Sequence, residues 1–166
     1  YAGNLRNIAK TLRQLEEISG SSKIEIAHEM EDLLAGSVEL YEDAARKQAL
    51  LAGYAKKCEH NISGDTIVVR LDQLAANLEE KADWMMKNIR ANEWVKDGED
   101  GWFNGYYDNH GRKVEGVMDE SVRMMLTGQV FAIMSGTATE DQVESICRSA
   151  DKYLYDQKAG GYRLNT

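Results

Sequence analysis

The stretch from Trp102 to Arg112 concentrates the side chains best suited to chemistry in this chain of 166 residues. It holds four aromatic rings, with Asn, Asp, His and Arg side chains among them. Such a set can bind a sugar, because the C–H faces of the sugar stack on aromatic rings while planar polar groups satisfy its hydroxyls. Alternating aromatic residues also form ordinary strands that dock on helices. The residues therefore predict either a sugar-binding hairpin or a hairpin that simply packs on the core.

Two later positions add to these candidates. Gln129 is a lone amide on an otherwise apolar helical segment, so it must either be satisfied inside the core or face a polar cavity. Glu120 belongs to an acidic pair that opens the same segment, where acids usually complement the positive end of a helix.

Metal and phosphate motifs give no further candidates. Glu25 and His28 have the Glu-x-x-His spacing of di-iron bundles, but the sequence has no second copy of that motif. The pair is therefore interpreted as a solvated helix face. Gly98 and Gly101 enclose two acids, which could not cradle a phosphate group. We assign no metal ligand and no catalytic residue.

The elements that must position these residues are mostly helices. Apolar spacing predicts an all-α fold of about six helices with small β-hairpin excursions. The hairpin is expected to pair Trp102–Tyr107 with Arg112–Glu115 around a turn at 108–111, and a β-branched run predicts a short strand within 61–70. The expected helices cover residues 5–18, 24–34, 42–57, 71–89, 122–134 and 140–155, the last beginning with a capping box at Thr139 and Gln142. No linker divides the chain, so 1–166 is expected to be one helical unit.

Composition narrows the class of protein. The chain carries 20 Lys and Arg against 28 Asp and Glu, a net charge of −8, which argues against binding to nucleic-acid backbones. No apolar run is long enough for a membrane span. Cys58 and Cys147 are expected to be reduced and buried, as in a cytoplasmic protein. The chain begins at Tyr1 rather than Met, and we expect a piece of a longer polypeptide.

The candidate residues also lie in an ordered series of motifs. The series consists of Asn92-Glu93-Trp94, then Asp100 to Gly111 (DGWFNGYYDNHG), then Leu126 to Gly136 (LTGQVFAIMSG). It resembles the inverting glycoside phosphorylases of the cellobiose, chitobiose and β-glucan phosphorylase type, the former glycosyltransferase family 36. The resemblance is clearest from about residue 71 to residue 164.

The resemblance implies a fold and a reaction. The fold is an (α/α)6 barrel, a toroid of six helical hairpins, of which this chain would be a fragment. In the reaction, a carboxylic acid protonates the glycosidic oxygen while inorganic phosphate attacks the anomeric carbon from the opposite face. The acid and the phosphate-binding residues of the family have no counterpart here, so the fragment is expected to be inactive. Inorganic phosphate would be the co-substrate of the parent enzyme, with no cofactor, and an oligosaccharide or β-glucan would be the substrate. The resemblance implies that Trp102, Tyr107, Glu120 and Gln129 form part of the substrate-side wall.

A second hypothesis is a stand-alone, non-catalytic helical module that binds a protein or a glycan. The two hypotheses differ in the surface they predict. A fragment of a barrel leaves inner helix faces uncovered, so it should expose a large apolar patch or self-associate. A self-contained module should be monomeric with a closed core.

Overall fold

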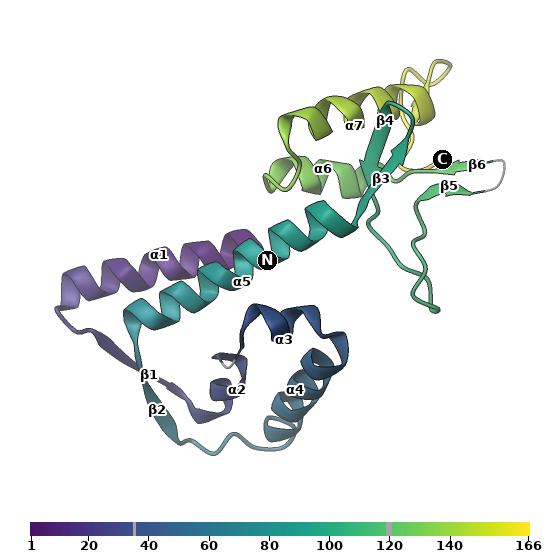
Figure 1. Cartoon of the computed structure of the whole chain (residues 1–166). Coiled ribbons are helices and arrows are strands. Elements are labelled where there is room, and N and C mark those ends of the chain that lie inside the picture. The colour runs from purple at the N-terminus through teal and green to yellow at the C-terminus, as the bar shows by residue number, and fades with distance from the viewer. Residues whose placement is uncertain (35, 119–120) are drawn as a thin grey trace. The chain divides into compact units, whose positions relative to one another are not determined.

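The computed structural model describes residues 1–34, 36–118 and 121–166 of the chain (Figure 1). These residues form two compact units, Tyr1–Met85 and Met86–Thr166. The boundary falls inside the long helix α5 (Leu71–Asn92), a continuous element whose sequence carries no linker signal.

Helices outweigh strands in the chain as a whole, which confirms the predicted fold class. The described ranges form seven α-helices and four two-stranded antiparallel sheets. None of these helices is both long and apolar enough to cross a membrane. The helices, besides α5, are α1 (Ala2–Ser19), α2 (Glu31–Leu34), α3 (Val38–Glu42), α4 (Ala44–Lys57), α6 (Leu126–Met134) and α7 (Glu140–Tyr153), with a 3-10 turn η1 (His28–Met30) before α2. The strands are β1 (Lys23–Ala27), β2 (Thr66–Arg70), β3 (Trp94–Asp97), β4 (Asp100–Phe103), β5 (Gly116–Met118), β6 (Ser121–Arg123), β7 (Tyr155–Asp156) and β8 (Gly161–Tyr162).

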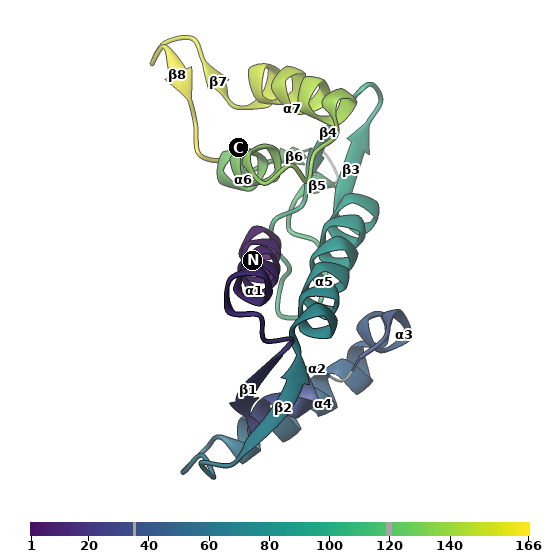
Figure 2. The ribbon, with the colours of Figure 1, turned by 90° about the vertical axis from the view of Figure 1, so that its left-hand side faces the viewer.

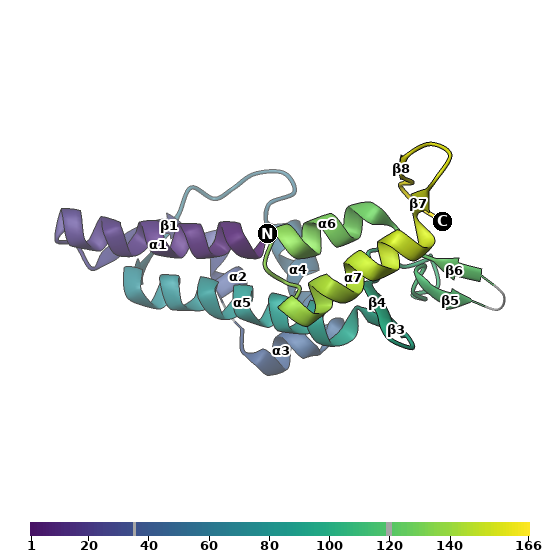
Figure 3. The same cartoon turned by 90° about the horizontal axis from the view of Figure 1, so that it is seen from above.

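The first unit has its core where α1 meets the first turns of α5, which lie side by side (Figure 3). Ala9 and Leu12 of α1 pack against Leu71 and Ala75 of α5. Helix α1 ends at Gly20, whose φ of 67° is the left-handed conformation that glycine adopts without steric cost. The predicted helices at 5–18 and 71–89 are therefore confirmed, with slightly wider bounds.

The segment from Ile24 to Leu34 corrects a prediction, because it is not one helix. Residues 23–27 form strand β1, which pairs antiparallel with β2, so that Ile24 lies opposite Val69 and Ile26 opposite Ile67 (Figure 2). The spacing of the apolar residues fits a helix, but Ile24 and Ile26 also alternate as in a strand. The strand forms because its partner, some forty residues away, supplies the hydrogen bonds.

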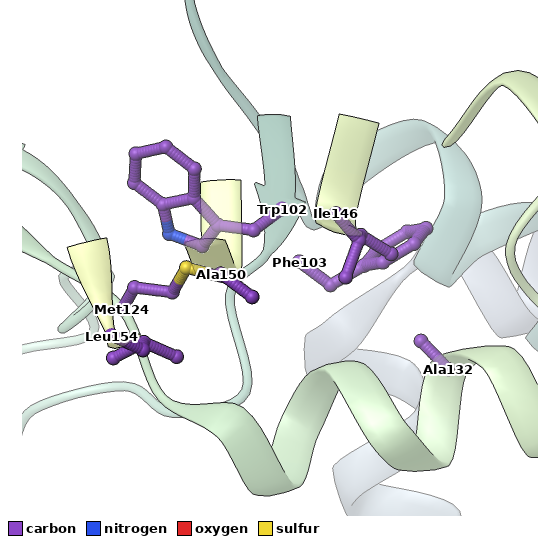
Figure 4. Packing of buried hydrophobic residues seen from close by; sticks show 7 residues of the cluster. All are labelled: Trp102, Phe103, Met124, Ala132, Ile146, Ala150 and Leu154. Atoms are coloured by element: carbon purple, nitrogen blue, oxygen red, sulfur yellow. The ribbon is translucent and has the colours of Figure 1, made fainter. Parts of the chain in front are cut away.

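The second unit is built around the buried strand β4. Trp102 and Phe103 of β4 are almost fully buried against Ile146, Ala150 and Leu154, from α7 and its C-terminal cap (Figure 4). The indole Nε1 of Trp102 donates a hydrogen bond to the main-chain oxygen of Arg123 at 3.1 Å. Helix α7 begins with the predicted capping box, in which the Thr139 hydroxyl and the Gln142 amide each bond the other's main-chain N–H.

The strand pairing around β4 differs from the prediction. The partner of β4 is the preceding strand β3, with Trp94 opposite Phe103, and not the segment 112–115. Only one isolated bridge, between Tyr107 and Lys113, remains of the predicted ladder. The predicted fifth helix also begins later, at Leu126, because residues 121–123 are held in β6 by pairing with β5.

The two cysteines are free thiols. Cys58 is half-buried, whereas Cys147 is exposed on α7, so the predicted burial of Cys147 is wrong. Glu120, one of the four predicted site residues, lies outside the described residues.

Candidate functional site

The aromatic segment forms a tight loop between β4 and β5, closed at its tip by Asp108. One oxygen of Asp108 accepts hydrogen bonds from the main-chain nitrogens of His110 (2.8 Å) and Arg112 (2.9 Å). The other oxygen pairs with the Arg112 guanidinium at 2.7 Å. These bonds, led by the Arg112 main chain, lower the pKa of Asp108. Gly111 has a φ of 75°, which the turn requires. The tip is therefore preformed by local contacts.

Gln129 anchors the base of this loop from inside helix α6. Its side chain is 1% exposed, and its amide is fully occupied. The amide oxygen accepts from the Phe103 nitrogen at 2.7 Å, and the amide nitrogen donates to the Phe103 oxygen at 2.8 Å and to the Met125 oxygen at 3.0 Å. Of the two alternatives for this lone amide, the structure therefore supports the one in which it is satisfied inside the core.

Glu115 is the second anchor of the loop and is 2% exposed. One carboxylate oxygen accepts from the Gly105 nitrogen and the other from the Met125 nitrogen, both at 2.8 Å. Burial raises the pKa of Glu115, and the two N–H donors partly offset that rise. The Glu115 nitrogen in turn donates to the Asn104 side-chain oxygen at 3.1 Å. Side-chain to main-chain bonds thus replace the strand ladder that we predicted here.

The exposed rim of the loop is organised by Glu93. The Tyr107 hydroxyl donates to its carboxylate oxygens at 2.7 and 2.9 Å, and the Asn104 amide donates to one of them at 3.0 Å. Partial burial and the Glu93 carboxylate raise the pKa of Tyr107 to about 12. The phenol is therefore neutral at ordinary pH, and the Tyr107 residue, which is 51% exposed, is accessible to solvent.

The chemistry open to this arrangement is binding rather than proton transfer. The exposed Tyr107 stands next to the polar side chains of the tip, a combination that suits a sugar. Both oxygens of Glu93 and both oxygens of Glu115 already accept hydrogen bonds within the loop. The described part of the chain contains no group of three or more His, Cys, Asp or Glu side chains that could hold a metal ion.

The predicted site residues fall into different environments. Tyr107 lies on the exposed rim, and Gln129 lies beneath the same loop. Trp102 is 0% exposed, so its ring has no free face within the described chain. The structure thus gives Trp102 and Gln129 positioning roles in the fold, and substrate contact by either stays a prediction.

Three residues of the site were missed as candidates: Glu93, Asn104 and Glu115. Signals for two of them exist in the sequence. Glu93 stands in the Asn-Glu-Trp motif. Glu115 is a single acid between Val114 and Gly116, and burying an acid without a partner is costly, so its burial would require hydrogen-bond donors.

Comparisons with known proteins bear on the same residues. The family model for the glycosyl hydrolase 94 superfamily, catalytic domain, matches residues 68–166, which is more than half of the chain and includes the whole loop. Solabiose phosphorylase from Paenibacillus borealis is 31% identical over 87 residues, which are 52% of this chain and 11% of that protein. The chain therefore spans only about a ninth of the length of this curated relative.

Proposed function

The chain belongs to the glycosyl hydrolase 94 superfamily, catalytic domain, and from that premise we propose that it is part of a carbohydrate phosphorylase. The proposed parent reaction cleaves a β-glycosidic bond with inorganic phosphate and yields a free sugar and an α-sugar 1-phosphate. The observation that carries the proposal is the preformed loop 104–115, whose aromatic and polar rim lies entirely inside the matched residues. The phosphorylase name of the relative supports the same reaction class.

In this proposal the loop is part of the substrate-side wall. Tyr107 offers its ring to a sugar face while Glu93 holds its hydroxyl and fixes its orientation. Gln129 and Glu115 hold the loop from below, and Trp102 anchors the strand that precedes it. Glu120 keeps its proposed place at the wall on the family resemblance alone.

The general acid of the reaction is proposed to come from outside this chain. An inverting phosphorylase needs one carboxylic acid that can reach the glycosidic oxygen. Neither Glu93 nor Glu115 suits that task, because the oxygens of both are held by donors within the loop. The isolated chain is therefore proposed to be inactive, with inorganic phosphate as co-substrate of the parent enzyme only.

Helix α6 supports the proposal that further helices complete the unit. Its outer face is apolar and exposed, with Val130 43%, Phe131 65% and Met134 77% accessible. A stand-alone module with a closed core would bury such a stripe. We propose that neighbouring helices of an (α/α)6 barrel cover this face in the parent enzyme, and that the isolated chain self-associates through it.

The test is phosphorolysis followed by ³¹P NMR. The protein that contains these residues and the isolated 166-residue chain are each given β-linked glucose disaccharides and inorganic phosphate. We expect phosphate-dependent α-sugar 1-phosphate from the parent protein and none from the chain alone. Sugar release without phosphate would refute phosphorolysis. Turnover by the isolated chain would show that the general acid lies within these 166 residues.

A further inference from the structure

A polar groove lies in the second unit, between the β3–β4 hairpin and helix α7, which pack against each other (Figure 1). Its volume is about 750 Å³, which falls within the range of about 300–1,000 Å³ for small-molecule sites. Residues from 94–100 line one wall, and residues from 139–148 line the other. The groove therefore shares no residue with the loop 104–115.

One wall of the groove carries the aromatic ring of Trp94. The indole lies across β4 at Gly101, where a Cβ atom would clash with the ring. The Phe103 ring meets the indole edge-on, with 4.9 Å between the ring centroids. These contacts fix the ring before any ligand arrives, so that stacking on it costs little additional conformational entropy.

Hydrogen bonds between the hairpin turn and α7 hold the two walls together. The Ser145 hydroxyl and the Arg148 guanidinium each donate to the main-chain oxygen of Glu99 at 3.1 Å. Asp100, on the same side of the groove, is held by Lys152 at 2.6 Å, and this contact lowers the pKa of the Asp100 carboxyl. The groove is therefore preformed, with one end closed by the contacts to Glu99.

Side chains of both charges line the groove. Lys96 and Arg148 supply cations, and Glu99 and Asp141 supply carboxylates. Among the residues that the structure describes, these four form no ion pair with one another. A ligand with a net charge would meet a like charge here, whereas a neutral ligand whose hydroxyls both donate and accept can bond cations and carboxylates alike. An aromatic ring beside such groups is the combination that suits a carbohydrate.

We propose that this groove is a second carbohydrate site, which binds a neutral β-linked glucose oligosaccharide of about two or three units. One sugar face stacks on Trp94, and the hydroxyls bond Lys96 and Asp141 from the two walls. The site would hold a glycan chain apart from the loop 104–115. The choice of glucose and of the β-linkage rests on the proposed function, whereas the aromatic and polar character of the groove does not.

The test titrates the full 166-residue chain with cellotriose and with laminaritriose, followed by ¹H–¹⁵N NMR. Glucose and sorbitol serve as a shorter ligand and as a polyol without a ring face. We expect the Trp94 indole signal and the Lys96 and Ser145 amide signals to shift with a trisaccharide and not with sorbitol. Glucose should bind about threefold or more weakly than the better trisaccharide, because it leaves much of the groove empty.

Variants locate the site. Trp94→Leu should weaken trisaccharide binding about tenfold, through loss of the stacking face. If Trp94→Leu does not fold, the double variant Lys96→Ala/Asp141→Ala decides the question, since both side chains are exposed, and it should weaken binding about threefold or more. The matched control is Lys158→Ala/Glu144→Ala, an exposed pair of the same unit that does not line the groove, which should bind like wild type.

Three results would overturn the proposal: a Trp94 signal that is unmoved by both trisaccharides, equal shifts with sorbitol, or full affinity in the double variant. The outcome is distinguishable from that of the proposed function, which is tested by phosphorolysis in the parent protein. Phosphorolysis together with an unmoved Trp94 signal would refute the groove alone. A Trp94 signal that responds in a protein without phosphorolysis would refute the proposed reaction alone.

Discussion

Replacing Gln129 with Met tests whether one buried amide joins helix α6 to strand β4. Met has nearly the same length and volume, so the change removes hydrogen bonds while leaving little cavity. The variant would leave the nitrogen and the oxygen of Phe103 without the partners that lie at 2.7 and 2.8 Å. Each buried main-chain group left unpaired costs about 1–3 kcal/mol, so the free energy of unfolding should fall by about 2–6 kcal/mol.

Urea denaturation followed by tryptophan fluorescence measures this loss, because Trp102 lies beside Phe103 in the same core. The control is Gln48→Met on helix α4, an exposed glutamine, which should change stability by less than about 0.5 kcal/mol. If Gln129→Met unfolds within about 0.5 kcal/mol of wild type, the amide is not the anchor that its geometry indicates.

Three further predictions concern the second unit. First, spectrophotometric titration should find a tyrosine with a pKa of about 12, and Glu93→Gln should move it toward 10. Because this folded-state pKa is raised, the stabilisation from Tyr107 is complete below about pH 10 and is lost as the pH rises through 12. Second, Gly101→Ala should lower stability by about 1–3 kcal/mol in thermal unfolding, since its Cβ would stand 2.3 Å from the Trp94 ring. Third, Phe131→Ser should reduce self-association in sedimentation velocity while changing stability by less than about 0.5 kcal/mol.

Each of these has a clear contrary result. All tyrosines titrating near pH 10 would mean that Glu93 does not hold Tyr107. Gly3→Ala is the control for Gly101→Ala, because a Cβ there meets nothing within 4 Å, so it should be neutral or slightly stabilising. Equal losses in the two glycine variants would rule out the contact with Trp94. A Phe131→Ser variant that associates like wild type would remove α6 as the contact face.

The parts of the fold that were predictable are those specified by neighbouring residues. Helix α7 is an example, because Thr139 and Gln142 form its cap three residues apart and apolar spacing sets its inner face. The turn at Asp108 is another, since its bonds reach only to His110 and Arg112.

The parts that were mispredicted depend on distant partners. Ile24 and Ile26 fit a helix or a strand equally well, and only their pairing with Val69 and Ile67 decides for β1. The burial of Gln129 could be anticipated as one of two outcomes. Its partner, Phe103, could not, because it lies 26 residues away on a strand whose own pairing was misassigned.

In the candidate site, too, features set by neighbouring residues were predicted and features set by distant partners were not. Tyr107 was found because an aromatic ring in a polar loop is visible locally. Glu93 and Glu115 were not, because their importance comes from the donors that meet them: Tyr107 and Asn104 for the first, and main-chain N–H groups for the second. The sequence marks Glu93 by its motif and Glu115 as an isolated acid, but it does not show which donors these carboxylates would meet.

The central claim is that the loop 104–115 forms a substrate-side wall in a phosphorylase, with Tyr107 as its exposed aromatic contact. The most direct measurement is kcat/KM for phosphorolysis by the parent protein, comparing Tyr107→Ala with Tyr106→Ala. The two residues are similarly exposed, at 51% and 52%, but only Tyr107 bonds Glu93, so kcat/KM is compared at a temperature where thermal unfolding shows both variants to be folded. We predict a loss of about 10- to 100-fold for Tyr107→Ala, equivalent to about 1.4–2.8 kcal/mol, and less than threefold for Tyr106→Ala. Equal effects of the two substitutions, or no effect of Tyr107→Ala, would contradict the account.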